Sequence, residues 1–158
     1  MALQLADDYK SIAEKIKAKY PVNFDYIEID KILFLTEDEK TPKKYAECRK
    51  VIAPYNFITD YRFIITFYAN NMINLSESQQ HMVVFHELCH IDSDFTKLKK
   101  HDFEDFKDVI MKAGNNPFWT IDPNCPDILE DNASPSINAA ALQQNEEDED
   151  EDAEPEMI

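Results

Sequence analysis

The chain has 158 residues and a formal net charge of −16 at pH 7, a length that fits one domain with a buried core. No stretch approaches the ~18 consecutive apolar residues of a membrane span, and the N-terminus lacks the charged and apolar regions of a signal peptide, so we expect no membrane association. The three cysteines are odd in number and scattered, which is typical of a reducing compartment and predicts a cytoplasmic protein without a disulfide framework.

The first elements alternate between helical and strand patterns. Residues 5–19 place apolar side chains at helical spacing and predict an amphipathic helix that ends before Pro21. Residues 24–35 are rich in β-branched and aromatic residues and predict one or two strands, whereas 45–52 is ambiguous between strand and helix. Residues 61–69 give the clearest strand. With the helices described below, this order predicts a small α+β domain whose mixed or antiparallel sheet has about three strands.

A zinc-site signature follows the strands. Residues 86–90 read H-E-L-C-H, and the capping-box pattern at 76–79 predicts that this H-E-x-x-H motif lies on a helix. On a helix, His86 and His90 lie one above the other and can bind the same ion. A zinc ion lowers the pKa of its bound water towards ~7, and Glu87 can accept the proton as that water attacks a carbonyl group. The motif therefore predicts a hydrolase and not only a metal site.

A catalytic zinc ion needs a third protein ligand. His101 is the next histidine, and helical spacing from Asp102 to a cap at Gly114 predicts that it lies at the start of a second helix. Asp102 or Asp105 could accept the hydrogen of its other ring nitrogen. The competing third ligands all carry a carboxylate: Asp94, Glu104 and Asp105.

Two further residues near the motif are left out of the predicted site. His81 lies about 140° around the helix from His86. Cys89 is interpreted as a small buried side chain, because the two histidines that flank it already point at the ion.

The position of the cleft depends on the strand at 61–69. This strand leads directly into the motif helix, so we expect it to lie along the cleft, where an extended peptide could pair with an exposed edge. The alternative is that 61–69 is an interior strand.

Two segments carry a resemblance to known proteins. F-H-E-L-C-H-I at 85–91 and K-L-K-K-H-D-F-E-D-F at 97–106 resemble the phage metallopeptidase family and, more distantly, the SprT-like zinc proteases. The likeness covers roughly residues 1–115. A glycine often follows the third histidine in the SprT-like family, where this chain has Asp102. The resemblance implies a zincin-type domain of a protein acting in a host cytoplasm, with the Zn²⁺ ligands His86, His90 and His101 and the catalytic base Glu87.

The composition changes beyond Gly114. We expect a metallopeptidase domain at 1–115, an extended strap at 116–130 and a disordered acidic tail at 131–158. Residues 146–156 hold nine acids, without which the formal net charge would be −7 rather than −16. We interpret the tail as solubilising, with contact to a basic partner or to the chain's own lysines as the alternative.

Together these patterns predict a zinc-dependent metallopeptidase that cleaves proteins or peptides, as an endopeptidase rather than an exopeptidase. One alternative is a non-catalytic zinc module whose acidic tail engages a basic partner. Another is a SprT-like protease acting on DNA-bound proteins, with lysine-rich clusters at 40–50 and 97–100 holding phosphates. The acidic net charge favours solvated loops over a nucleic-acid site.

Overall fold

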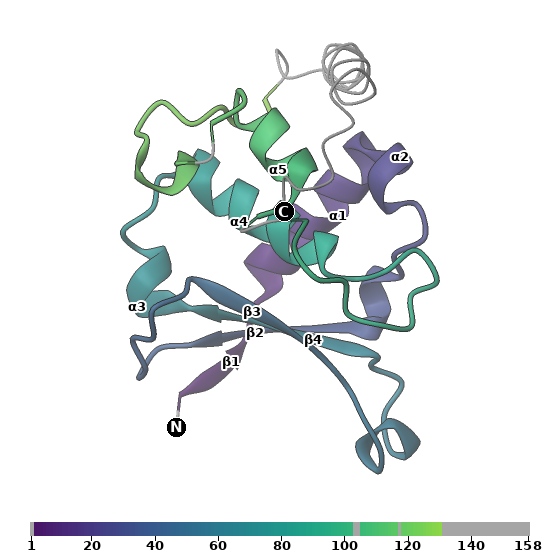
Figure 1. Cartoon of the computed structure of the whole chain (residues 1–158). Coiled ribbons are helices and arrows are strands. Elements are labelled where there is room, and N and C mark those ends of the chain that lie inside the picture. The colour runs from purple at the N-terminus through teal and green to yellow at the C-terminus, as the bar shows by residue number, and fades with distance from the viewer. Residues whose placement is uncertain (1, 103–104, 117, 131–158) are drawn as a thin grey trace.

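The computed structural model describes residues 2–102, 105–116 and 118–130, which form a four-stranded sheet with helices against one face (Figure 1). The elements in chain order are β1 (Leu3–Leu5), α1 (Asp7–Lys19), α2 (Pro21–Phe24), β2 (Ile32–Glu37), β3 (Ala46–Lys50), β4 (Phe63–Tyr68), α3 (Ala69–Met72), α4 (Glu77–Cys89) and α5 (Lys107–Lys112). Single 3₁₀ turns cover Ile29–Lys31, Tyr55–Phe57 and Trp119–Ile121. Among the described helices, none combines the length and the apolar character that spanning a membrane requires.

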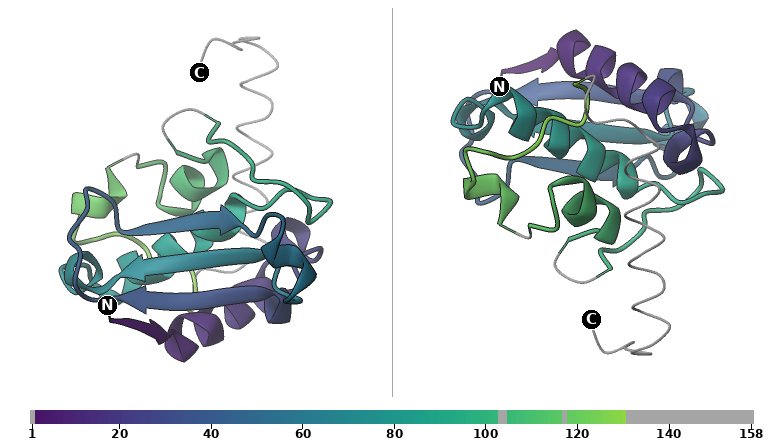
Figure 2. Two further views of the ribbon diagram at one scale, coloured as in Figure 1. Left: turned by 90° about the horizontal axis from the view of Figure 1, so that it is seen from below. Right: turned by 90° about the horizontal axis from the view of Figure 1, so that it is seen from above.

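The sheet is mixed and has the strand order β1-β2-β4-β3. β2 and β4 are parallel, and the outer strands β1 and β3 run antiparallel to their neighbours. Figure 2 shows α1, α4 and α5 on the same side of this sheet. The predicted α+β class is confirmed, with one strand more than expected.

Two segments near the N-terminus differ from their predicted structure. The predicted helix at 5–19 begins at Asp7, because Leu3–Leu5 pairs with Leu35–Glu37 as a short edge strand. The predicted strands within 24–35 reduce to β2, since Pro21 starts a one-turn helix and a 3₁₀ turn precedes Ile32. Helical turns therefore override the local strand propensity of residues 24–31.

The strand at 61–69 does not lie along the cleft, so that prediction is wrong and its alternative is right. β4 pairs with β2 on one side and with β3 on the other. Its inward side chains Phe63, Ile65 and Phe67 are fully buried, as suits a central strand. The ambiguous segment 45–52 instead supplies the edge strand β3.

Helix α4 is the centre of the hydrophobic core. Its residues Met82 to Phe85 are all buried, which explains why its sequence is apolar nearly all round. Phe85 contacts the ring of Tyr20 edge-on, with 5.7 Å between the centroids. Lys112 of α5 is only 6 % exposed, and its Nζ lies 5.2 Å from the ring centres of both Tyr20 and Phe85. A buried cation in this core is compensated by the faces of two aromatic rings.

Candidate metal centre

Helix α4 places the first two histidines, and its start is fixed by the predicted capping box. Ser76 Oγ accepts a hydrogen bond from Gln79 N (3.2 Å), and Gln79 Oε1 accepts one from Ser76 N (2.8 Å). The helix ends at Cys89, and His90 keeps a helical backbone as its C-terminal cap. His86 and His90 therefore share one face, with 5.2 Å between their ring centroids.

A tight loop returns the chain from α4 to the third histidine. Asp92 Oδ1 accepts hydrogen bonds from Thr96 N (2.8 Å) and Lys97 N (3.1 Å), and Ile91 forms a β-bridge with Leu98. The loop places His101 Nε2 3.1 Å from both His86 Nε2 and His90 Nε2. One ring nitrogen from each histidine lies within 4.8 Å of the other two.

His101 was predicted to lie at the start of a helix, but the structure places it in this loop. Helix α5 begins only at Lys107, because Asp102 Oδ2 accepts the backbone hydrogen of Lys107 (3.0 Å) and Asp105 Oδ1 that of Phe106 (2.7 Å). These carboxylates satisfy backbone donors at the helix start from outside the first turn. The predicted cap is confirmed at the other end, where Gly114 has φ +79° and bonds Met111 O.

The other ring nitrogens of His86 and His90 have acceptors that fix the orientation of each ring. His86 Nδ1 donates to Asp105 Oδ1 (2.6 Å), and His90 Nδ1 donates to the carbonyl oxygen of Lys99 (2.9 Å). With Nδ1 protonated in both rings, each Nε2 presents a lone pair to the point where the three histidines converge. Asp102 or Asp105 was predicted to accept the hydrogen of His101, but the structure pairs Asp105 with His86 and Asp102 with the backbone of Lys107.

Asp105 is itself held from the C-terminal side of the chain. Trp119 Nε1 donates to Asp105 Oδ2 over 2.8 Å. Burial alone would raise the pKa of Asp105, but the hydrogen bonds from His86, Trp119 and the Phe106 amide lower it below its ordinary value. The carboxylate therefore stays ionised beside His86. Sequence reasoning missed this hydrogen bond from Trp119 to Asp105. The signal that pointed to Trp119 is that it is the single tryptophan of the chain.

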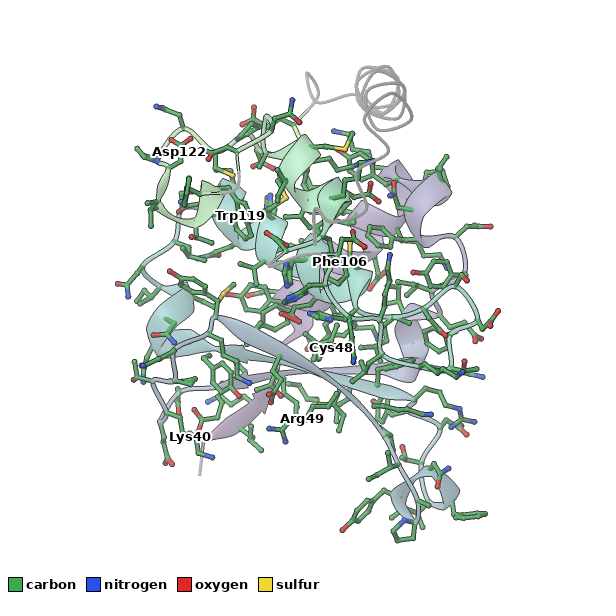
Figure 3. All side chains as sticks on the ribbon, in the orientation of Figure 1. Lys40, Cys48, Arg49, Phe106, Trp119 and Asp122 are labelled. Carbon is green, nitrogen blue, oxygen red and sulfur yellow. The ribbon has the colours of Figure 1, made fainter. Side chains whose placement is uncertain are left out.

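The ring of Phe106 supports all three histidines. Its centroid lies 5.1 Å from that of His86, 4.9 Å from His90 and 5.1 Å from His101. In Figure 3, Phe106 marks the α5 side of the site and Cys48 its β3 side. Burial lowers the pKa of His90 to about 4 and also lowers that of His101, so both rings are neutral near pH 7, the form that binds metal ions.

Glu87 lies beside the histidines and is 5 % exposed. Within the described part of the chain, its Oε2 is buried and has no hydrogen-bond partner. Burial raises the pKa of Glu87 to about 7, with His86 acting in the opposite direction. An unpaired buried carboxylate oxygen lowers stability, and Glu37 Oε1 is the other such atom among the described residues.

The histidines and Glu87 open onto a cavity of about 440 Å³. One wall is formed by residues 44–48, which include the first part of the edge strand β3. Another wall is formed by Trp119 and Thr120. The strand that lines the site is therefore β3 and not β4.

The comparison with known families bears on this geometry. A family model described as "Putative phage metallopeptidase" matches residues 1–131. The chain belongs to this family. No curated protein and no solved structure matches the chain. A metallopeptidase family implies a metal ion and a protein or peptide substrate, which agrees with the histidine cluster in the cavity.

The metallopeptidase family match runs beyond residue 115, the predicted end of the domain, and includes the strap. Gln79 Nε2 donates to the carbonyl oxygens of Trp119 (3.0 Å), Thr120 (3.0 Å) and Asp122 (3.1 Å), so the motif helix itself holds this segment. Further on, Tyr20 Oη donates to Ile128 O (2.6 Å). The predicted acidic tail at 131–158 lies outside the described residues.

The other described candidates are not part of the histidine cluster. Asp94 is exposed in the loop after α4, and Glu104 lies outside the described residues. His81 Nδ1 instead pairs with Asp127 Oδ1 over 2.8 Å. Cys89 is buried and, like the other two cysteines, forms no disulfide.

Proposed function

We propose that the protein is a zinc-dependent endopeptidase in which His86, His90 and His101 bind the ion and Glu87 is the general base. The observation that supports this most is a convergence of three imidazole nitrogens beside a buried carboxylate that has an unpaired oxygen. Three histidines are a ligand set known for catalytic zinc, and they leave one coordination position open.

The distances fit such an ion. Ligand nitrogens about 2.0–2.1 Å from a tetrahedral zinc ion lie roughly 3.3–3.4 Å apart. The separations of 3.1 Å from His101 Nε2 to the other two Nε2 atoms are close to this value. Asp105 and the Lys99 carbonyl orient two of the rings in the way that residues behind metal-binding histidines usually do.

The chain's own residues then account for the proton transfers. When bound, zinc supplies a Lewis acid that acidifies water and polarises the scissile carbonyl group. The Glu87 carboxylate accepts the proton of the attacking water and returns it to the leaving amine nitrogen. Its raised pKa, about 7, suits a group that must both accept and donate near neutral pH.

The edge strand β3 suits an extended substrate. Its partner is β4 on one side, and its outer edge borders the cavity that contains Glu87. A peptide that adds to this edge through main-chain hydrogen bonds would run past the histidines. Because the strand extends beyond the site, such a peptide is held away from its own ends, which favours an endopeptidase.

The two alternatives have less support. A purely structural zinc site gives no reason for the unpaired oxygen of Glu87, whose burial would only lower stability. A protease acting on DNA-bound proteins would need free positive charge to bind phosphates. The lysine-rich cluster at 40–50 has less of it than its sequence suggests, because Lys44 and Arg49 both pair with Glu47.

The test compares two glutamates of α4 in the zinc-loaded full chain. Glu87→Gln should retain zinc and lower kcat on a quenched-peptide library by about 10²–10⁴. Glu77→Gln is the matched control, since the Glu77 side chain is 84 % exposed in the first turn of the same helix, and it should keep parental activity. Equal activity of Glu87→Gln and parent would contradict the mechanism. Zinc binding without any cleavage by the parent would favour the non-catalytic module.

A further inference from the structure

A second hollow, of about 300 Å³, lies further along β3 from the proposed active site. It is bounded by the end of β3, the start of β4, the 3₁₀ turn between them and the loop after α4. Its lining residues are Lys50, Val51, Asn56, Arg62, Phe63, Phe95 and Thr96.

The alternation of side chains along β3 puts the two hollows on the same side of the strand. The β3–β4 register places Ala46, Cys48 and Lys50 opposite the buried Phe67, Ile65 and Phe63, so all three face the helix side of the sheet. Ala46 and Cys48 line the active-site cavity, which Glu47 also borders, and Lys50 lines the second hollow. Two residues of strand span about 6.6–6.8 Å. A peptide paired with the edge of β3 at the level of Glu87 would therefore pass the second hollow within two to four of its own residues.

Two cationic side chains, Lys50 and Arg62, line this hollow. The β3–β4 pairing places Lys50 opposite Phe63, and Val51 N donates to Arg62 O over 2.9 Å, so Lys50 and Arg62 come from adjoining positions of the hairpin. Both residues are exposed, and among the described residues neither has an ion-pair partner. Arg62 Nη1 makes only a long contact of 3.4 Å with Asp60 O.

The rest of the lining contains no acidic residue and has an apolar floor. Phe63 is fully buried, and Phe95 contacts it edge-on with 5.1 Å between the ring centroids. Phe95 has φ +59°, and its backbone N–H donates to Asp92 O over 2.9 Å, which closes the turn that forms this wall. The same loop supplies the Lys99 carbonyl to His90, which ties the hollow's position to that of the metal site.

We propose that Lys50 and Arg62 form a subsite for an acidic side chain of the substrate, on the side of the scissile bond nearest the carboxyl end of β3. The proposal rests on the proposed peptidase function and on pairing of the substrate with β3. A guanidinium fork and an ammonium group above an apolar floor bind a carboxylate through charge-assisted hydrogen bonds. A lysine at the same substrate position meets like charge and is disfavoured.

The test uses the zinc-loaded full chain and one quenched peptide that it cleaves. Aspartate, asparagine or lysine is placed in turn at each of four positions on either side of the scissile bond. We expect one or two positions where aspartate gives about tenfold higher kcat/KM than lysine, mainly through KM, because the charge acts away from the reacting bond.

The double variant Lys50→Glu/Arg62→Glu should reverse this preference, so that the lysine peptide becomes the better substrate. The control Lys10→Glu/Lys15→Glu changes the net charge equally on helix α1, outside both hollows and outside β3, and should keep the parental preference. If thermal unfolding shows that the first double variant does not fold, the single variants Lys50→Gln and Arg62→Gln should each reduce the preference.

The outcomes separate the two proposals. Cleavage without any charge preference, or a preference that survives the changes at Lys50 and Arg62, would overturn the subsite and leave the peptidase intact. A parent that cleaves no peptide would overturn the peptidase, and the subsite with it.

Discussion

Trp119 donates its indole hydrogen to one oxygen of Asp105 while the other oxygen receives His86 Nδ1. A residue of the strap is thus two hydrogen bonds away from a proposed metal ligand. The strap closes one wall of the cavity and, through Asp105, also fixes the ring of His86, a proposed metal ligand.

Trp119→Phe should lower zinc affinity by a few-fold, up to about tenfold. Phenylalanine keeps most of the buried ring but cannot donate to Asp105, which then holds His86 less firmly. Competition with a chromogenic chelator measures the effect. In an Asp105→Asn background the same change should cost less, because the two residues act in series. Full additivity of the two changes would show that Trp119 acts independently of Asp105.

Asp105→Asn should weaken zinc binding by about 10–100-fold. An amide offers one acceptor oxygen, so it cannot accept from both His86 and Trp119, and its NH₂ group would face one of these donors. The same chelator competition measures the loss. Asp94→Asn, in the exposed loop, is the control and should match the parent.

His101→Ala should lower zinc affinity more than any other single change outside α4, because two protein ligands are too few for a catalytic zinc site. Zinc binding should also stabilise this loop less in the variant than in the parent, since the metal would no longer tie the loop to the helix. Asp94→Ala and Glu104→Ala should change the affinity little. A retained affinity in His101→Ala, with a collapse in one of the other two, would reassign the third ligand.

The sequence was sufficient for the parts of the molecule that depend on local pattern. The capping box, the helical motif and the glycine cap after α5 all follow from short-range rules and are confirmed. The strand order does not follow from such rules. β4 is rich in strand-forming residues, whereas β3 contains no β-branched or aromatic residue, and its pairing with β4 makes it the edge strand that lines the site.

The surroundings of the site show the same limit. His101 was predictable as a candidate by its chemistry, but the helix expected after it starts five residues late because acidic side chains bond the backbone ahead of α5. Which histidine Asp105 supports depends on how the loop folds back, a contact across 19 residues. The contact from Trp119 to Asp105 likewise requires the strap to pack against α4.

Lys112→Met should leave the free energy of unfolding at pH 7 unchanged or raise it by up to about 1 kcal/mol, since methionine fills the site without a buried charge. Burial lowers the pKa of Lys112 below its ordinary 10.5, with Asp108 acting in the opposite direction. Between the lowered pKa and 10.5 the unfolded chain binds more protons, so the parent gains stability as the pH rises.

Urea unfolding of the metal-free protein from pH 7 to 10 measures this slope, which Lys112→Met should reduce. Lys15→Met, at an exposed position of α1, is the control and should keep it. A strongly destabilised Lys112→Met would instead show that the cation contributes net stability through the rings of Tyr20 and Phe85.

Deletion of 131–158 should leave the domain folded. The family match ends at 131, and the contacts of Tyr20 with Ile128 and of Lys19 with Glu130 are retained. Thermal unfolding should stay cooperative, with the free energy of unfolding within about 0.5 kcal/mol of the parent. Loss of the cooperative transition would show that the deleted segment contributes to the fold. A rise in activity would make the tail regulatory.

Gln79 joins two segments that lie 40 residues apart. Its side-chain oxygen caps the first turn of α4, and its nitrogen holds three carbonyl groups of the strap. The strap therefore cannot detach without removing that amide's acceptors, and the helix cannot fray at its start without releasing the strap. Local opening at either place is one event with one free energy. The strap thus shares the fluctuations of the helix that carries His86 and His90.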